Sequence, residues 1–68
     1  MTDKEVGARI EQMRQSRGLS QKELAAKAGL GLSTVQRAED GNEGLSLKNL
    51  RKIAEGLSCD LEILLRSR

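Results

Sequence analysis

The side chains best placed to do chemistry lie together between residues 32 and 37. Positions 32 and 36, and positions 33 and 37, are one helical turn apart, so a helix here presents them on one face. The residues at these positions are Leu32, Ser33, Gln36 and Arg37. Val35 and Ala38 lie on the other side of such a helix. A contiguous face with hydroxyl, amide and guanidinium groups can donate and accept hydrogen bonds to a ligand.

Groups that serve catalysis or metal binding are scarce. The chain has no His and a single Cys, Cys59, which argues against a structural zinc site and excludes an internal disulfide. We find no nucleophile elbow, no phosphate loop and no pair of catalytic carboxylates. We therefore expect no enzymatic activity and no cofactor. Cys59 is interpreted as a small apolar core residue, in preference to a redox switch.

Length and composition favour one small domain over residues 1–68 with an aliphatic core, because the chain contains no Phe, Tyr or Trp. No apolar run approaches the roughly 18 residues that cross a bilayer, and no export leader is evident, so we expect a cytoplasmic protein. The net charge of +2 is a weak argument for nucleic acid. The basic surplus falls within residues 1–27.

Three helices are predicted around the polar face. A four-then-three spacing of apolar residues predicts a first helix over residues 3–17, closed by Gly18. Ser20 and Glu23 form a Ser-x-x-Glu capping box that starts a second helix at residue 21. That helix ends after about eight residues at Gly29, and a tight turn leads to a third helix over residues 32–40.

Two further helices follow. Ser46 is a good N-cap, and the apolar residues after it recur with a 3.6-residue period. These residues are Leu47, Leu50, Ile53, Ala54 and Leu57. Asp60 is predicted to cap a short fifth helix that contains Leu61, Leu64 and Leu65. Residues 66–68 are expected to form a frayed basic end.

A short capped helix, a glycine-containing turn and a second short helix make a helix-turn-helix. The sequence resembles the Cro and phage-repressor (XRE-type) helix-turn-helix family from Val6 to Leu65. The resemblance is carried by Ile10-x-x-Met13-Arg14, Leu19-Ser20-Gln21-Lys22-Glu23-Leu24-Ala25, Ala28-Gly29, Ser33-Thr34-Val35, Glu39-x-Gly41 and Leu50-x-x-Ile53-Ala54-x-x-Leu57. It implies an all-α, five-helix lambda-repressor-like fold, with helices two and three as the helix-turn-helix.

The resemblance implies that the helix over residues 32–40 enters the major groove of DNA, where its early residues contact base edges. Carried over, the base-contacting positions are Leu32, Ser33, Gln36 and Arg37. Arg37 has the donors that suit guanine O6 and N7, against the alternative of a solvated surface residue. Leu32 has two equal alternatives, a thymine-methyl contact or packing against Leu30.

Backbone contacts are implied elsewhere. Gln21 lies in the first turn of its helix, where free amides and the positive helix pole favour a phosphate, and it matches a family Gln that contacts the DNA backbone. Lys22 and Lys27 are solvated charges or phosphate contacts. Gly41 and Asn42 are candidates to offer backbone amides to the other strand.

Arg14 and Glu39 match a family pair in which an Arg of the first helix bridges to the acid that ends the helix in the major groove. The resemblance therefore implies a structural ion pair that fixes the angle of that helix, while the edge of Arg14 is also a candidate phosphate contact. A partly buried pair of this kind serves orientation more than stability.

The sequence departs from the family pattern at three positions. Asp40 stands where a basic or amide residue is common, and Glu43 stands in a loop that usually carries positive charge. Carboxylates near the DNA backbone lower affinity, so we expect modest, salt-sensitive binding. Ala38 is smaller than the usual aliphatic residue, which predicts looser packing of the third helix.

Three classes of function remain open. The first is a transcriptional regulator, in particular a repressor, that binds a palindromic operator in double-stranded DNA as a homodimer. The second is the antitoxin of a toxin–antitoxin pair, which adds a toxin protein as partner. The third is a protein-binding module that no longer binds DNA. For the dimer contact the candidates are Leu61 and Leu65, with completion of the monomer core as the equal alternative.

Overall fold

The computed structural model describes residues 2–41 and 45–65, and every regular element in these ranges is an α-helix. In chain order the helices are α1 (Asp3–Ser16), α2 (Gln21–Ala28), α3 (Leu32–Asp40), α4 (Leu47–Gly56) and α5 (Leu61–Leu64). The predicted all-α, five-helix fold is confirmed. None of the helices in the described ranges has the length and apolar character needed to span a membrane.

The first two helices begin at reciprocal capping boxes. The Thr2 hydroxyl accepts from the Glu5 amide at 3.2 Å, and the Glu5 carboxylate accepts from the Thr2 amide at 2.9 Å. Ser20 and Glu23 repeat this arrangement at 3.0 and 2.8 Å. These hydrogen bonds hold the pKa of both carboxyl groups below the usual value. The second box is the one predicted from the sequence.

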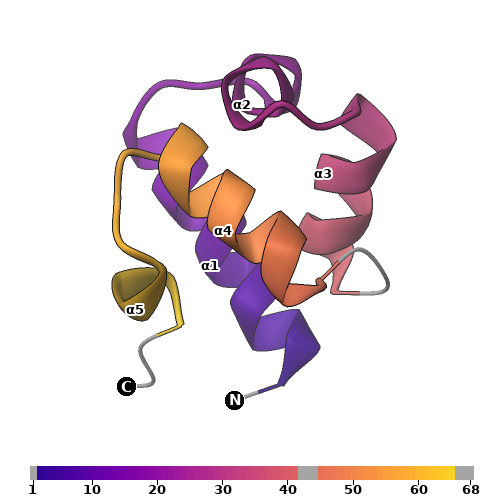
Figure 1. The fold of residues 1–68 in the computed structure, drawn as a ribbon, viewed down its shortest axis with the longest axis vertical. Helices are drawn as coiled ribbons and strands as arrows, with labels where there is room; N and C mark the ends of the chain where they lie inside the picture. The colour runs from indigo at the N-terminus through magenta and orange to yellow at the C-terminus, as the bar shows by residue number, and fades with distance from the viewer. Residues whose placement is uncertain (1, 42–44, 66–68) are drawn as a thin grey trace.

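The apolar faces of the helices meet in one aliphatic core. In Figure 1, α2 crosses the top of the molecule, α3 lies at the right, α4 lies in front of α1, and α5 lies at the lower left. Helix α1 packs against α3, and α2 packs against α4. The largest fully buried side chains come from all five helices and the residue that ends α4, and they are Ile10, Leu24, Val35, Ile53, Leu57 and Leu64.

Helices α1 and α3 approach each other backbone to backbone at Gly7. A Cβ atom at this position would lie 2.5 Å from the carbonyl oxygens of Ala38 and Glu39. Next to this contact, Gly41 ends α3 with φ of +73°, and a Cβ there would lie 2.6 Å from the Cα of Lys4. The C-terminal end of α3 therefore lies directly on the first half of α1.

Two arginines of the N-terminal part hold the C-terminal part. Arg17 Nε donates to the carbonyl of Leu57 at 2.6 Å, where α4 ends. Arg9 Nε donates to the carbonyl of Ile63 in α5 at 3.2 Å. Carbonyls at a helix end lack intrahelical partners, so these guanidinium groups satisfy acceptors that the short helices leave open.

Two expectations for the C-terminal part need correction, one at Leu47 and one at Asp60. Leu47 follows the apolar period of α4 but is 55% exposed. Asp60 occupies the N-cap position of α5, yet its side chain makes no capping hydrogen bond.

Leu61 and Leu65 are half-buried and pack against the core, in agreement with the alternative that they complete the core of the monomer. Cys59 also packs there, and its burial raises the pKa of the thiol, as expected of a small core residue.

Candidate nucleic-acid interface

The turn between α2 and α3 is tight because its first residue adopts a left-handed conformation. Gly29 has φ of +70°, and the following amide of Leu30 donates to the carbonyl of Ala25 at 2.9 Å. Ala25 is 4% exposed, so a small side chain lies where the two helices approach. Leu30 packs against the core, which fixes the start of α3 relative to α2.

Helix α3 separates a buried side from an exposed one. Val35 and Ala38 are fully buried, and Glu39 is 8% exposed. The opposite side, which we call the outer face, consists of Leu32, Ser33, Gln36 and Arg37, all of them exposed. The side chains of Ser33, Gln36 and Arg37 make no hydrogen bond to any other residue that the structure describes. Their donors and acceptors are therefore directed to solvent or to a ligand.

The N-terminus of α3 lacks the side-chain cap found at α1, α2 and α4. Gly31 stands at the N-cap position and can supply no side-chain oxygen. Ser46, by contrast, accepts from the amide of Asn49 at the start of α4 at 3.2 Å. An uncapped helix start keeps free amides and the positive end of the helix dipole, both of which favour an anion.

Three polar side chains from three helices meet at the other end of α3. Arg14 donates from Nε to Glu39 Oε2 at 2.6 Å and from Nη2 to Oε1 at 3.2 Å. Its remaining nitrogen, Nη1, donates to the carbonyl of Leu19 at 2.8 Å. Gln21 Nε2 donates to Glu39 Oε1 at 2.9 Å. The hydrogen bond to Glu39 raises the pKa of Arg14, which keeps the guanidinium charged.

This Arg14–Glu39–Gln21 network connects α1, α2 and α3 through one carboxylate. The Arg14 and Glu39 side chains are 11% and 3% exposed, so the pair is shielded from solvent. A bidentate Arg–carboxylate pair is geometrically specific, which suits a role in setting the angle between helices. The outer face is thus presented by a helix that is fixed by polar contacts and by the backbone contact at Gly7.

Sequence and structure comparisons agree on the family. The family model described as helix-turn-helix matches residues 10–64. The chain belongs to this helix-turn-helix family. The crystal structure of the restriction-modification controller protein C.AhdI from Aeromonas hydrophila is similar, with a TM-score of 0.88 and 35% identity over 93% of this chain and 96% of that one.

Two further structures share the fold. The wild-type restriction-modification controller protein C.Esp1396I has a TM-score of 0.84 and 26% identity, with 91% of this chain and 80% of that chain covered. A chain of the SinR–SinI complex has a TM-score of 0.83 and 33% identity, with 91% of this chain and 61% of that chain covered. No curated protein sequence matches the chain.

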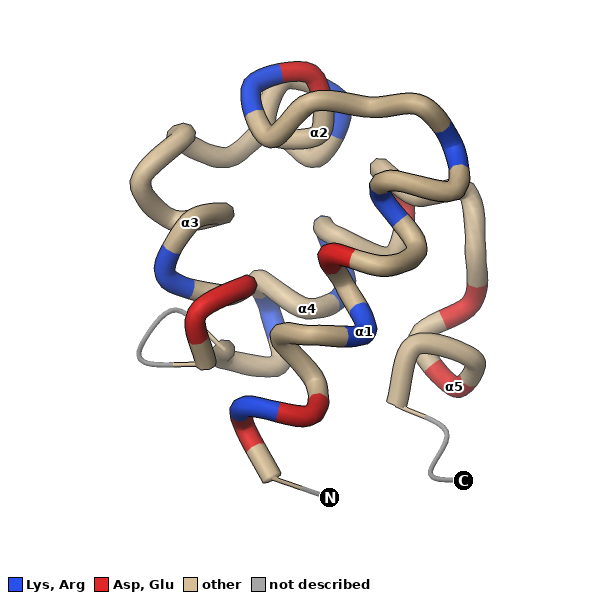
Figure 2. Tube along the Cα trace, turned by 180° about the vertical axis from the view of Figure 1, so that it is seen from behind, with Lys and Arg blue, Asp and Glu red and all other residues tan. Residues whose placement is uncertain are grey.

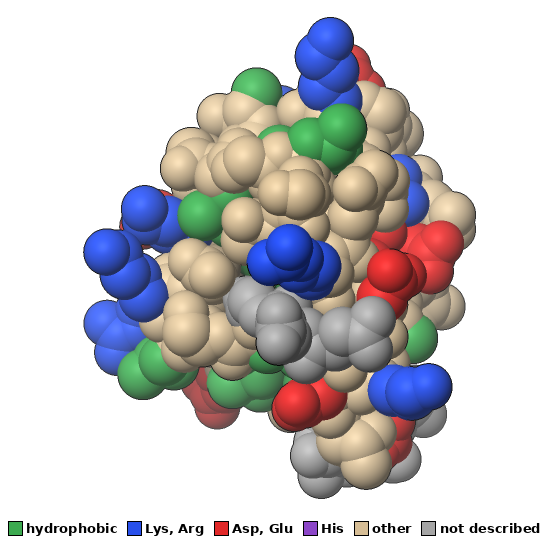
Figure 3. Space-filling view, turned by 90° about the vertical axis from the view of Figure 1, so that its right-hand side faces the viewer, with side chains coloured by type: hydrophobic (Ala, Val, Ile, Leu, Met, Phe, Trp, Pro, Cys, Tyr) green, Lys and Arg blue, Asp and Glu red, His purple; other side chains and the backbone are tan. Residues whose placement is uncertain are grey.

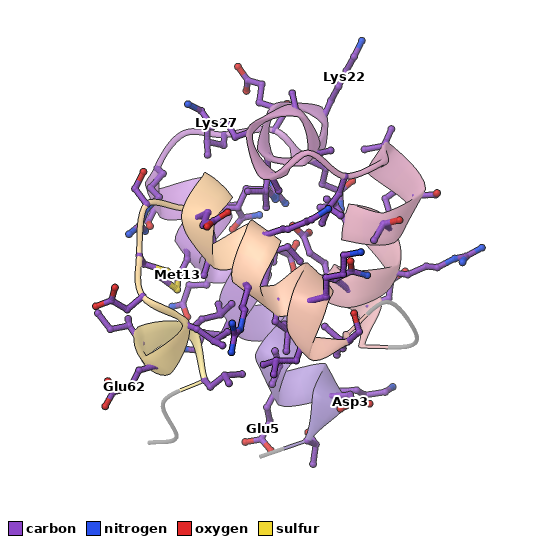
Figure 4. All side chains as sticks on the ribbon, viewed as in Figure 1. Asp3, Glu5, Met13, Lys22, Lys27 and Glu62 are labelled. Carbon is purple, nitrogen blue, oxygen red and sulfur yellow. The ribbon has the colours of Figure 1, made fainter. Side chains whose placement is uncertain are left out.

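The predicted phosphate-contacting residues differ in exposure and in hydrogen bonding. Lys22 and Lys27 are exposed, and both side chains extend away from α2 (Figure 4). Gln21 is half-buried, and its amide nitrogen is held by Glu39. Arg14 directs all its nitrogens to protein acceptors, so the geometry supports its structural role and gives no support to a phosphate contact. Asn42 lies outside the described residues.

The charge around the helix-turn-helix is uneven. Figure 3 looks at the side on which α3 lies, and it shows basic side chains along one edge and acidic ones along the opposite edge. The acidic end of α3, Glu39 and Asp40, lies beside the first turn of α1, as Figure 2 shows from behind. Asp40 is exposed, and a carboxylate near a DNA backbone lowers affinity.

Two features of the site are not predicted from the sequence. Gln21 and Glu39 both belong to the family motifs, but the motifs do not show that their side chains form a hydrogen bond. The second is the close approach at Gly7, for which a glycine in the middle of an amphipathic helix is a signal.

Proposed function

We propose that this chain is a sequence-specific transcriptional regulator that inserts α3 into the major groove of double-stranded DNA. The observation that carries the proposal is the outer face of α3, where three polar side chains are exposed and make no hydrogen bond to other described residues. Helices of this kind place their early residues against base edges. The similarity to the controller protein C.AhdI at 35% identity supports the same assignment.

The roles of individual residues follow from their positions. Arg37, Gln36 and Ser33 contact base edges, and Leu32, at 42% exposed, contacts a thymine methyl. Lys22 contacts a phosphate near the start of α2. Gln21 positions Glu39 through its amide nitrogen, and its oxygen carries no hydrogen bond in the described structure, so it is available to a backbone-bound water.

We propose that the regulator acts as a homodimer on a palindromic operator and represses transcription there. A protein of this size covers only one half-site, and two-fold proteins contact half-sites one helical turn apart. It acts by binding, without catalysis, in the cytoplasm where its DNA target lies. A protein partner is a further element of the proposal, supported by the neighbour that is complexed with SinI.

The antitoxin alternative has less support. The relatives described above are named as controller proteins and as SinR, and none of these names refers to a toxin. Loss of DNA binding, the third class, is disfavoured by the exposed outer face of α3.

Selection from random-sequence duplexes with the purified protein tests the proposal. We expect a palindromic consensus with half-site centres about one helical turn apart. The matched control is an Arg37→Ala, Gln36→Ala double variant, which should retain weak, salt-sensitive binding but enrich no consensus. Failure of the parent protein to enrich any sequence would overturn the assignment.

A further inference from the structure

Leu32 is an exposed apolar side chain that folding leaves outside the core. It is 42% exposed, whereas Leu30, two residues earlier, packs against the core. The other large apolar side chains that are exposed in residues 2–41 and 45–65 are Leu47 and Ile63, which belong to α4 and α5. Leu32 is therefore the apolar member of the outer face of α3.

The backbone beside Leu32 leaves room for a close approach. Leu32 is the first residue of α3, and the N-cap residue before it is Gly31. A Cβ atom at Gly31 would have no atom within 4 Å beyond its chain neighbours, so the space beside this turn is open. A helix that enters the major groove contacts base edges with its N-terminal residues. A large apolar side chain at this position can therefore reach a base edge.

The major-groove edges of the base pairs offer one apolar group, the C5 methyl of thymine. The other groups there are hydrogen-bond donors and acceptors. The side chain of Leu32 can neither donate nor accept, so on a pyrimidine edge it gains chiefly from burial of a methyl group. In 5-methylcytosine the methyl group is attached to the same ring atom as in thymine. Leu32 therefore responds to the methyl group, whichever of the two bases carries it.

We propose that Leu32 makes binding depend on the methyl group of one pyrimidine in each half-site, so that methylation of a cytosine at this position strengthens binding as a thymine methyl does. This inference rests on the DNA-binding function proposed above and names a chemical feature of the operator. It also gives that function a form of regulation, because a site with cytosine at this position is weak until the cytosine is methylated.

The polar neighbours of Leu32 respond to other groups. Ser33, Gln36 and Arg37 carry donors and acceptors, which pair with polar groups of the pyrimidine or of the purine opposite. Removal of a methyl group leaves these polar groups in place. Thymine and uracil share one hydrogen-bonding pattern, and 5-methylcytosine and cytosine share another. These two comparisons therefore isolate Leu32 from the polar side chains of the outer face.

The test combines methyl removal with Leu32→Ala on the site obtained by selection. Each thymine of one half-site is replaced in turn by uracil, and the dissociation constant is measured with labelled duplexes for the wild type and for Leu32→Ala. We expect one thymine whose methyl group strengthens wild-type binding about fourfold, the factor supplied by burial of one such group, and leaves the binding of Leu32→Ala unchanged. At that position 5-methylcytosine should exceed cytosine by a similar factor, again for the wild type alone.

Ser33→Ala is the matched control, since it changes the next residue of the outer face and should bind less tightly while it keeps both methyl effects. Leu32→Ala should keep the melting temperature of the wild type, because the side chain that it shortens is exposed. Partial unfolding would weaken binding to every duplex alike, so it cannot imitate a loss confined to one methyl group.

The outcomes separate this inference from the function on which it rests. If the wild type enriches no sequence, the proposed function fails together with the inference. A clear consensus in which no thymine shows a methyl effect that Leu32→Ala removes would leave the proposed function standing and overturn the role of Leu32. Equal wild-type affinity for cytosine and 5-methylcytosine at the identified position would overturn the dependence on cytosine methylation.

Discussion

Helices α2 and α3 have similar lengths and both end at a glycine with positive φ, yet they are held in different ways. Helix α2 is closed at its N-terminus by the Ser20–Glu23 capping box and at its C-terminus by Gly29. Helix α3 has no side-chain cap at its start and is held instead at its far end, through Glu39 and the contact with Gly7.

This difference suits two separate roles, in which α2 supports the motif and α3 contacts the proposed DNA. An element whose terminal amides are satisfied by its own side chains has little left to offer a ligand, whereas α3 keeps its first amides and its outer face free. The Arg14–Glu39 pair and the close approach of Gly7 hold α3 near its C-terminal end, away from its uncapped start. Helix α3 is therefore fixed in position while its outer face and first amides stay exposed.

The largest predicted effect comes from breaking the Arg14–Glu39 ion pair, which holds α3 in position. Arg14→Met should lower the free energy of unfolding by about 3 to 5 kcal/mol, because Glu39 is left as a buried, unpaired acid. DNA affinity should fall with it. Adding Glu39→Leu should recover part of the stability, and chemical denaturation of the two single variants and the double variant measures this. Strictly additive losses would show that the two residues act independently.

The backbone contact at Gly7 gives the next largest effect. Ala normally stabilises a helix relative to Gly, but here the added Cβ would meet two carbonyl oxygens of α3 at 2.5 Å. We expect Gly7→Ala to lower the free energy of unfolding by about 1 to 3 kcal/mol. Gly31→Ala is the control for an added Cβ without a clash, since nothing lies within 4 Å of that position, and it should lower stability only by about 0.5 kcal/mol because Ala is a poorer N-cap than Gly. A stabilised Gly7→Ala variant in thermal denaturation would contradict the close packing of α1 and α3.

The contrast between α2 and α3 predicts different effects on DNA binding for Arg37 of α3 and Gln21 of α2. Arg37→Ala should cost about 1 to 3 kcal/mol at the preferred site and relax the preference at one base pair in each half-site. Gln21→Ala should weaken binding to all sites alike and leave the consensus unchanged, because Gln21 positions Glu39. Site selection repeated with each variant measures both. An unchanged consensus for Arg37→Ala, with a salt slope reduced by about one, would assign Arg37 to a phosphate.

The fold was predictable because its signals are local. The Ser20–Glu23 box, the glycine at 29 and the apolar period of α4 each mark an element within a few residues, and the structure confirms those elements. The contacts that hold α3 in position were harder to predict from the sequence, because the hydrogen bond from Gln21 to Glu39 depends on the packing of two helices against each other. The exposure of Leu47 could not be inferred either, since the apolar period of a helix does not show which part of its apolar face has no neighbouring helix.

A smaller effect concerns the capped start of α2. Ser20→Ala should lower the free energy of unfolding by about 1 kcal/mol through loss of the N-cap. The pKa of Glu23 is held below its usual value of 4.5 by the hydrogen bonds with Ser20, so its stabilising contribution is present above pH 4.5. That contribution is lost as pH falls through the lowered pKa, because the protonated acid accepts more weakly. The difference in melting temperature between wild type and Glu23→Gln should therefore narrow in acid, and a constant difference would contradict the capping box.

The smallest change in stability is expected from a substitution that gives α3 the N-terminal cap that it lacks. This substitution is also the most direct test of the contrast between α2 and α3. Gly31→Asp supplies a carboxylate to the first amides of α3, and an acid at a helix N-terminus also interacts favourably with the dipole, so unfolding should cost a few tenths of a kcal/mol more. The same carboxylate occupies amides that are proposed to face DNA and adds negative charge beside the phosphates, so DNA affinity should fall at every sequence. Gly31→Ser is the matched control, because it caps without charge and should weaken DNA binding less. Urea denaturation and DNA titration on the same preparations separate the two quantities. If Gly31→Asp gained stability and bound DNA as tightly as the parent, the uncapped start of α3 would have no part in recognition, and the contrast with α2 would be structural only.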